Sequence, residues 1–285
     1  MHSAPELHRL DLQPIVETAL REDIGFGDIT TVATVLKDTR AIGIIEANGD
    51  GIVAGLPVVV EVFRQLDPTI IVEALRTDGQ VVAPGDTIAR LVGSARHLLT
   101  GERVALNFLQ RLSGIATLTN RYVREVSGTR ARITDTRKTT PGLRVLEKYA
   151  VRVGGGHNHR MDLNHAVMIK DNHIVAAGSI SEAVGRVIGS IGHTMTIVVE
   201  CETIEHVYEA LDSGADILLL DNMPLDLLAL SVRSIAGRAI TEASGSITLG
   251  NVSEVAATGV EYISIGALTH SAPSMDIRLN IELSE

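Results

Sequence analysis

The chain has 285 residues, of which 45% are hydrophobic, and its formal net charge is −10. That length and apolar content suit one large α/β domain, or one such domain with a smaller companion. The chain contains no Trp, three Phe and four Tyr. These features exclude a general nucleic-acid or membrane-surface binder, because such proteins need cationic surfaces and stacking rings.

Three features of the sequence predict a cytoplasmic protein. No run approaches the ~20 apolar residues of a membrane-spanning helix. Residues 1–13 lack the basic-then-apolar layout of a secretory signal. The single cysteine, Cys201, cannot form an intramolecular disulfide and fits a reducing compartment. Because it lies in an apolar run, we expect Cys201 to be an inert core thiol.

The first hundred or so residues predict an α+β domain. A helix is expected around residues 7–20, and a Gly/Asp-rich loop follows it. Short β-like runs bounded by turn signals come next, at residues 41–46, 69–75 and 87–92. A helical segment at 57–65 interrupts them, and a long helix is expected at about 97–126.

From residue 131 onward, short apolar runs each lead into a polar, charged or small residue. The six runs are ARITD, HAVMI, TIVV, DILLL, AIT and EYISI, and they lead to Asp135, Lys170, Glu200, Asp221, Ser244 and Gly266. The gaps between these residues are 21 to 35 residues, which is long enough for a crossover helix. The runs also lack polar alternation, as strands buried on both faces do.

Repeated strand–helix units with functional groups at the strand ends are typical of an α/β barrel. We therefore predict an N-terminal α+β domain at 1–112 and an incomplete (β/α) barrel of about six or seven parallel strands at 113–269. The tail, 270–285, is a segment that can pack back on the first domain. A seventh strand is sought near 112–118 or 151–153, and an open doubly wound sheet is the alternative.

Positive charge is concentrated between Arg130 and His173, where nine Lys or Arg face four acids. Four of the ten histidines and the triple glycine 154–156 fall in the same stretch. An acidic protein keeps cations together where something anionic binds, or where each cation is paired locally. The composition predicts a pocket for a strongly anionic small molecule.

In a barrel, all the strand-end groups face one mouth. Positive charge would come from Arg137, Lys138, Arg160 and Lys170. The carboxylates of Glu200 and Asp221 suit Mg²⁺, which prefers oxygen ligands and substrate phosphates. The last two units end in the segments 242–246 and 266–268, and the small residues within them expose backbone N–H groups, as phosphate-binding loops do. Together they predict a phosphorylated substrate that carries further anionic groups.

Three segments, TDTRKTTPGLR, KYAVRVGGGHNHR and HAVMIKDNHI, closely resemble the signature of the quinolinate phosphoribosyltransferase family. EDIGFGDITT, GERVALNFLQRLSGIAT, ILLLDN, EASG and ISIGALTHS extend the resemblance, in the family's order, over nearly the whole chain. It implies transfer of the phosphoribosyl group of phosphoribosyl pyrophosphate to quinolinate with decarboxylation, giving nicotinate mononucleotide, pyrophosphate and CO₂ in NAD biosynthesis. It also implies the predicted fold and a homodimer in which the neighbouring N-terminal domain closes each barrel mouth.

The resemblance implies a role for each matching residue. Lys138, Lys170, Glu200 and Asp221 would be catalytic, and Glu200 and Asp221 would hold Mg²⁺ or ribose hydroxyls. Quinolinate and the sugar phosphates would lie against Thr136, Arg137, Lys138, His159, Arg160 and Lys170, with Arg103 reaching in from the partner. The 5′-phosphate would bind Ser244, Gly245, Ser246, Ile265, Gly266 and Ala267. Ser246 departs from the expected Gly or Asn, which puts its phosphate contact in doubt.

Other interpretations of the same residues stay open. The His157-Asn158-His159 spacing also suits zinc ligands, with Lys170 and an Asp as further ligands. Lys170 at a strand end also suits a Schiff base, although we expect it to act electrostatically. Ion-paired scaffold is an alternative role for Glu200 and Asp221, although two consecutive strands that end in acids beside a basic cluster favour a functional one. A non-catalytic anion-binding protein on the same scaffold is a further alternative.

Other polar residues in the same stretch are expected to have structural or solvent-facing roles. Arg144, Lys148 and Arg152 recur every four residues on a predicted helix, and we expect them to form a solvated stripe. His165 and His173 are expected to be hydrogen-bonded structural residues.

Overall fold

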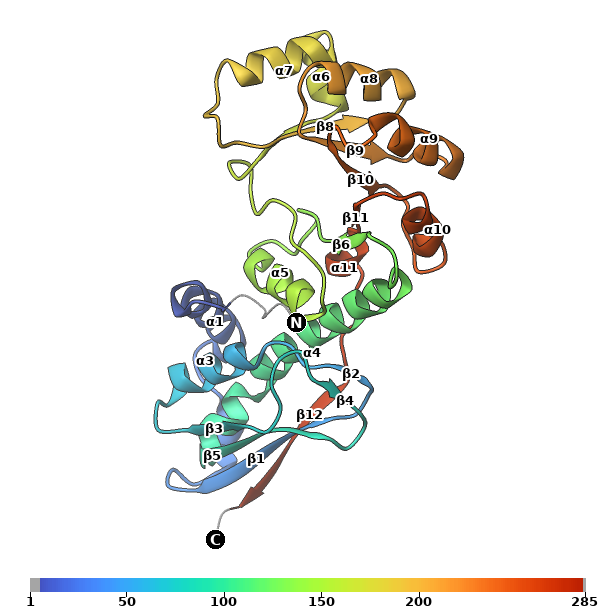
Figure 1. Ribbon diagram of the computed structural model, residues 1–285. Coiled ribbons are helices and arrows are strands. Elements are labelled where there is room, and N and C mark those ends of the chain that lie inside the picture. Colours follow the sequence, from blue (N-terminus) through green and yellow to red (C-terminus); the bar gives the residue numbers. More distant parts are fainter. Residues whose placement is uncertain (1–5, 284–285) are drawn as a thin grey trace. The chain divides into compact units, whose positions relative to one another are not determined.

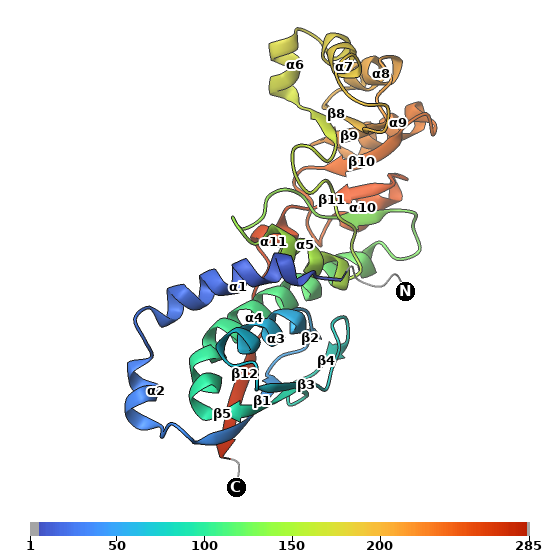
Figure 2. The same cartoon turned by 90° about the vertical axis from the view of Figure 1, so that its left-hand side faces the viewer.

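The computed structural model describes residues 6–283, which fall into two compact units (Figures 1 and 2). The first unit draws on Met1–Asn120, Thr139–Gly155 and Leu268–Glu285, and the second on Arg121–Lys138 and Gly156–Ala267. No helix within residues 6–283 combines the length and the apolar content that crossing a membrane requires.

The first unit is built on a four-stranded antiparallel sheet. Its strand order is β12-β1-β5-β3, with β12 at Ile277–Leu283, β1 at Arg40–Ala47, β5 at Thr87–Ser94 and β3 at Ile71–Ala74. The C-terminal strand β12 pairs with β1 along its whole length. β1 alternates between buried and more exposed positions, which is what a strand with one face on a core requires. A short ribbon pairs β2 (Gly51–Ile52) with β4 (Val81–Val82).

Helices complete the first unit. They are α1 (Arg9–Ile24), α2 (Ile29–Thr34), α3 (Leu56–Leu66), α4 (Ala95–Glu125), α5 (Arg144–Val153) and α11 (Ala267–His270), of which α4 and α11 run across the division between the units. Helices α3 and α4 pack closely, because a Cβ added at Gly101 would lie 2.7 Å from Leu66 Cδ1. Figures 1 and 2 show both helices on the same side of the four-stranded sheet.

A buried ion pair links two helices of the first unit. Arg111 on α4 donates from Nε and Nη2 to Glu147 Oε1 of α5, at 3.2 and 2.9 Å. Thr140 donates its backbone N–H to Glu147 Oε2 and its hydroxyl to Oε1, at 3.0 and 2.8 Å. Both oxygens of the fully buried Glu147 carboxylate therefore have partners.

The second unit is a six-stranded parallel sheet with helices against it (Figure 1). Its order is β6 (Arg132–Thr134), β11 (Tyr262–Ser264), β10 (Ile240–Ser244), β9 (Ile217–Asp221), β8 (Ile197–Cys201) and β7 (Val167–Ile169). The helices are α6 (Asp171–Ala177), α7 (Ile180–Ile188), α8 (Ile204–Asp212), α9 (Leu225–Ile235) and α10 (Val252–Ala257).

The strand order confirms the incomplete barrel. From β7 to β11 each strand lies beside the next in sequence, and the first strand, β6, lies beside the last, β11. A doubly wound sheet would instead reverse its order in the middle. The order is that of a barrel opened between β6 and β7, with an additional parallel bridge between Thr134 of β6 and His157.

Two expectations from the sequence are wrong. Neither candidate for a seventh strand is extended: residues 112–118 lie inside α4, and 151–153 form the last turn of α5. A short apolar run reads alike in a buried strand and on a helix face, so composition could not separate them. The solvated stripe also fails at Lys148, which is fully buried, while Arg144 and Arg152 are half-buried.

Candidate active site

A cavity of about 550 Å³ lies within the second unit, among the C-terminal ends of its strands. It gathers eleven of the predicted site residues: Thr136, Arg137, Lys138, His159, Arg160, Lys170, Glu200, Asp221, Ser244, Gly245 and Ser246. The geometry follows from the parallel sheet, which brings the carboxyl ends of all its strands to one edge.

Hydrogen bonds to β6 hold the His159–Arg160 loop in place. His157 donates its N–H to Ile133 O at 2.8 Å, and Asp135 donates its own to His157 O at 3.2 Å. The fully buried Asp135 carboxylate then accepts the N–H of His159 at 2.9 Å. The loop therefore runs as an extension of the sheet, which directs His159 and Arg160 into the cavity.

Two arginines, Arg137 and Arg160, line the cavity. Burial and the neighbouring Arg137 charge lower the pKa of the Arg160 guanidinium, and Asp162 opposes this shift. Arg160 also donates from Nη1 to Ala166 O at 2.9 Å, which fixes its side chain. Two guanidiniums that line one cavity give it a positive field that an anion would relieve.

Lys170 follows β7 and forms an ion pair with Glu200 at the end of β8. Lys170 Nζ lies 3.1 Å from Glu200 Oε2, and the lysine side chain is 47% exposed. The pair employs Lys170 as an ammonium group, whereas Schiff-base formation needs a neutral amine. The backbone N–H of Lys170 also donates to His173 Nδ1 at 3.0 Å, so His173 has the structural hydrogen bond expected of it.

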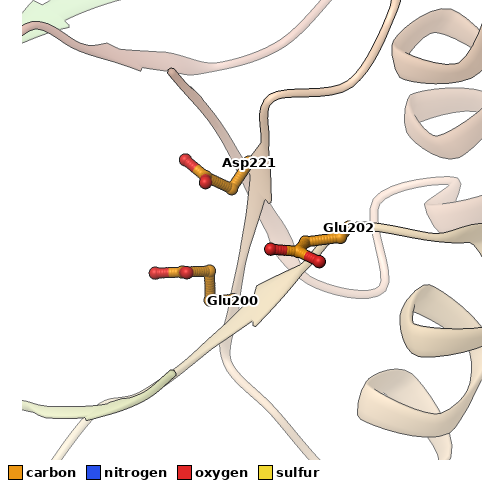
Figure 3. A group of neighbouring side chains, drawn as sticks. All are labelled: Glu200, Glu202 and Asp221. Atoms are coloured by element: carbon orange, nitrogen blue, oxygen red, sulfur yellow. The ribbon is translucent and has the colours of Figure 1, made fainter. Parts of the chain in front are cut away.

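Three carboxylates converge at the strand ends (Figure 3). Glu200 on β8, Asp221 at the end of β9 and Glu202 just beyond β8 offer oxygen atoms that lie within 4.8 Å of one another. Sequence reasoning missed Glu202. The alternation Glu200-Cys201-Glu202 carried the signal, because residues two apart on a strand share a face.

These carboxylates fit a hard divalent cation. Oxygen donors with one side open to the cavity match the coordination that Mg²⁺ prefers, which leaves room for waters and phosphate oxygens. Zinc prefers nitrogen and sulfur ligands. Among the described residues, His157 and His159 do not belong to the group whose ligand atoms converge. The zinc interpretation therefore has no geometric support.

The loop after β10 has an unusual backbone. Gly245 has φ +92°, and a Cβ added there would lie 2.1 Å from Asn222 Oδ1 and 2.9 Å from Asn222 N. Ser246 follows with φ +53°, a left-handed conformation that costs a non-glycine residue energy. Asn251 Nδ2 donates to Ser246 O at 3.1 Å. The position that departs from the expected Gly or Asn is therefore one whose backbone favours them.

Four predicted residues do not line the cavity. Arg103 lies on the exposed side of α4, in the first unit. Ile265, Gly266 and Ala267 follow β11, and Ile265 is buried with its N–H donated to Thr134 O at 3.0 Å. In their place the structure adds lining residues that the sequence did not predict: Met168, Leu219, Asn222, Glu242 and Ser264.

Cys201 is a core residue that does not line the cavity. It is fully buried, and burial, with the nearby Glu200 charge, raises the pKa of its thiol to about 12. A thiol this far from ionisation is a poor nucleophile at neutral pH. The expectation of an inert core thiol is confirmed.

Comparison with known proteins gives a consistent result along the whole chain. Residues 28–113 match the family model for the quinolinate phosphoribosyl transferase N-terminal domain, and residues 115–280 match the model for its C-terminal domain. A probable nicotinate-nucleotide pyrophosphorylase (carboxylating) of Bacillus subtilis is 45% identical over 278 residues, which cover 98% of this chain and 96% of that protein. A relative of the same description from Synechocystis is 44% identical over 273 residues, covering 95% and 92%.

Solved structures agree with this similarity. NadC from Streptococcus pyogenes superimposes with a TM-score of 0.95 at 40% sequence identity, covering 99% of this chain and 100% of that one. The nicotinate-nucleotide pyrophosphorylase from Ehrlichia chaffeensis gives 0.92 at 39% identity, covering 98% and 100%.

Proposed function

The chain belongs to the quinolinate phosphoribosyltransferase family, and we propose that it transfers the phosphoribosyl group of phosphoribosyl pyrophosphate to quinolinate. The products are nicotinate mononucleotide, pyrophosphate and CO₂, in NAD biosynthesis. One observation carries the proposal: a single cavity is lined by two guanidiniums, by the carboxylates of Glu200 and Asp221 and by a small-residue loop. These three elements match the two carboxylates, the ribose and the phosphates of the substrates.

Quinolinate binding falls to the cationic side of the cavity. Planar guanidiniums bind carboxylates in a bidentate way, and quinolinate has two adjacent carboxylates to offer. Arg137 and Arg160 take this role, with Thr136 and Lys138 beside them. Lys138 and Lys170 supply further charge toward the phosphates without forming a covalent bond to substrate.

Mg²⁺ is proposed as the cofactor, held by Glu200 and Asp221 with Glu202 in reach. When bound, it would neutralise charge on the pyrophosphate leaving group. Glu200 and Asp221 are also proposed to stabilise the positive charge that develops on the ribose carbon. Lys170 keeps Glu200 oriented through its ion pair. The 5′-phosphate is proposed to bind the backbone of Ser244, Gly245 and Ser246.

The enzyme is further proposed to be a cytoplasmic homodimer with shared active sites. Arg103 is exposed on α4 and forms no hydrogen bond or ion pair with residues 6–283, so its guanidinium is available to a partner's substrate. Mixing Arg103→Ala subunits with Arg160→Ala subunits tests this. Recovery of activity in the mixed dimer, in which one site is intact, is expected if Arg103 acts in trans.

The direct test is product formation. The protein is incubated with quinolinate, phosphoribosyl pyrophosphate and Mg²⁺, and nicotinate mononucleotide and CO₂ are followed together. Equal amounts of both, absent without Mg²⁺, are expected. Binding of both ligands without turnover would instead identify a binding relative. Turnover of nicotinate in place of quinolinate would overturn the roles given to the arginines.

A further inference from the structure

Glu242 places a carboxylate on the cavity wall that does not belong to the Glu200–Glu202–Asp221 group. It lies on β10, two residues before the strand ends, and is 4% exposed. Its Oε2 lies 3.5 Å from His159 Nε2. Its Oε1 is buried and finds no hydrogen-bond partner among residues 6–283. Buried polar oxygens are nearly always hydrogen-bonded, so this one calls for a ligand or a function.

His159 holds the other oxygen in a defined way. The backbone N–H of Arg160 donates to His159 Nδ1 at 2.7 Å, so Nδ1 carries no proton. A neutral imidazole then carries its proton on Nε2, which faces Glu242 Oε2. Because Asp135 also fixes the backbone of His159, the donor is held on a rigid loop. The arrangement places one oxygen of Glu242 beside His159, while the other is buried in the cavity wall without a hydrogen-bond partner among residues 6–283.

A carboxylate here opposes the binding of quinolinate, which is a dianion with a neutral ring. The charge on the ring changes during the reaction. The ring nitrogen forms its bond to the ribose carbon as the bond from that carbon to pyrophosphate breaks, and the ring becomes a cation. The bond to the 2-carboxylate then breaks, its electron pair stays on the ring carbon, and that carbon takes a proton from water. Positive charge thus appears in the ring only once reaction begins.

We propose that Glu242 is the counter-ion of the pyridinium ring formed in the reaction, and that His159 is the residue that positions it. This inference rests on the proposed function of the same cavity. Stabilisation of a charge that is absent in the ground state lowers the barrier without tightening substrate binding. The role also explains why the carboxylate is buried and left with an open oxygen.

The test uses two probes that differ only in ring charge: quinolinate and N-methylpyridinium-2,3-dicarboxylate. Their affinities for the full-length protein are measured by calorimetry in the presence of Mg²⁺. The wild type should prefer the cationic ring, and Glu242→Gln should lower that preference by about ten- to a hundredfold. Quinolinate itself should bind the variant at least as well as the wild type, while kcat falls by about a hundredfold.

Matched variants separate this role from a structural one. Glu242→Asp retains the charge and should keep most of the preference. His159→Gln retains a donor toward Glu242 and should keep it, whereas His159→Leu should lose part of it. Ser264→Ala, on the neighbouring strand and also facing the cavity, should leave the ratio of the two affinities unchanged.

Three results would overturn the inference. The first is an unchanged affinity ratio in Glu242→Gln. The second is an equal loss of affinity for both probes, which indicates a structural role. The third is a wild type without preference for the cationic ring. Because these are binding measurements, they stand apart from turnover. If the wild type makes nicotinate mononucleotide and the ratio does not move, only the counter-ion falls. A wild type that binds neither probe and makes no product overturns the proposed function as well.

Discussion

Two buried glutamates, one in each unit, show that the same side chain can either stabilise the fold or interact with a ligand. Glu147 in the first unit is fully buried, and its two oxygens accept from Arg111 and Thr140 at 2.8 to 3.2 Å. Glu242 in the second is 4% exposed, has one partner at 3.5 Å and leaves an oxygen open. A carboxylate with every lone pair engaged holds a fold together. One left open keeps its interaction for a ligand.

The backbone differs between the units in the same way. The non-glycine residues with positive φ among those described are Asn222, Ala236 and Ser246, and all belong to the second unit. Asn222 and Ser246 line the cavity. Strained conformations persist where the surroundings hold them and where function uses them. Backbone strain at non-glycine residues is therefore confined, among the described residues, to the second unit, where two of the three strained residues line the cavity.

The largest expected effect comes from substituting each of the two glutamates in a separate variant. Glu147→Gln leaves the Arg111 charge without its counter-ion in a buried setting, so it should lower the free energy of unfolding by about 3–5 kcal/mol. Glu242→Gln should change it by less than about 1 kcal/mol, because only the 3.5 Å contact with His159 is affected. Urea unfolding followed by circular dichroism measures both. Equal losses for the two variants would contradict the contrast.

Arg137 sharpens the cavity side of the comparison. Arg137→Ala should lower kcat/KM for quinolinate by about two to three powers of ten, because a carboxylate loses a charged fork, while stability is nearly unchanged. Arg137→Lys should restore little of it, since an ammonium cannot bind in a bidentate way. Arg132→Ala is the matched control, from exposed β6 surface outside the cavity. Near-normal turnover by a folded Arg137→Ala protein would contradict the assignment of Arg137 to quinolinate binding.

Much of this architecture was readable in the sequence, because strand ends in a parallel sheet converge. The six strands of the barrel and the cavity residues Lys170, Glu200, Asp221 and Ser244 follow from that rule, whereas His159 was expected only from the family resemblance. Glu242 was not singled out because it was grouped with 243–246 as the start of a phosphate-binding loop, whereas β10 runs through it to Ser244. A charged residue in a buried strand breaks the apolar pattern that locates strands, so sequence reasoning is weakest where function departs from the rule.

A substitution at Gly245 tests the strained loop after β10, and its expected effect on stability is intermediate in size. Gly245→Ala combines a positive φ with a collision against Asn222, so it should cost about 1–3 kcal/mol of stability and raise the KM for phosphoribosyl pyrophosphate. Gly250→Ala is the control on the same segment, because its nearest atom would be 3.7 Å away and its φ is ordinary. Equal tolerance of the two substitutions would show that the loop rearranges freely.

Ser246 gives the smallest effect and the finest distinction. With φ at +53°, Ser246→Gly should raise the free energy of unfolding by about 1 kcal/mol, because glycine enters this conformation without steric cost. Ser244→Gly, in extended strand backbone, should lower it by about 0.5–1 kcal/mol. Steady-state kinetics then decide the role of the Ser246 hydroxyl. A stabilised variant with unchanged KM for phosphoribosyl pyrophosphate means that the backbone alone binds phosphate there. A raised KM despite the added stability means that the hydroxyl is retained for the ligand at the expense of the fold, as the open oxygen of Glu242 is.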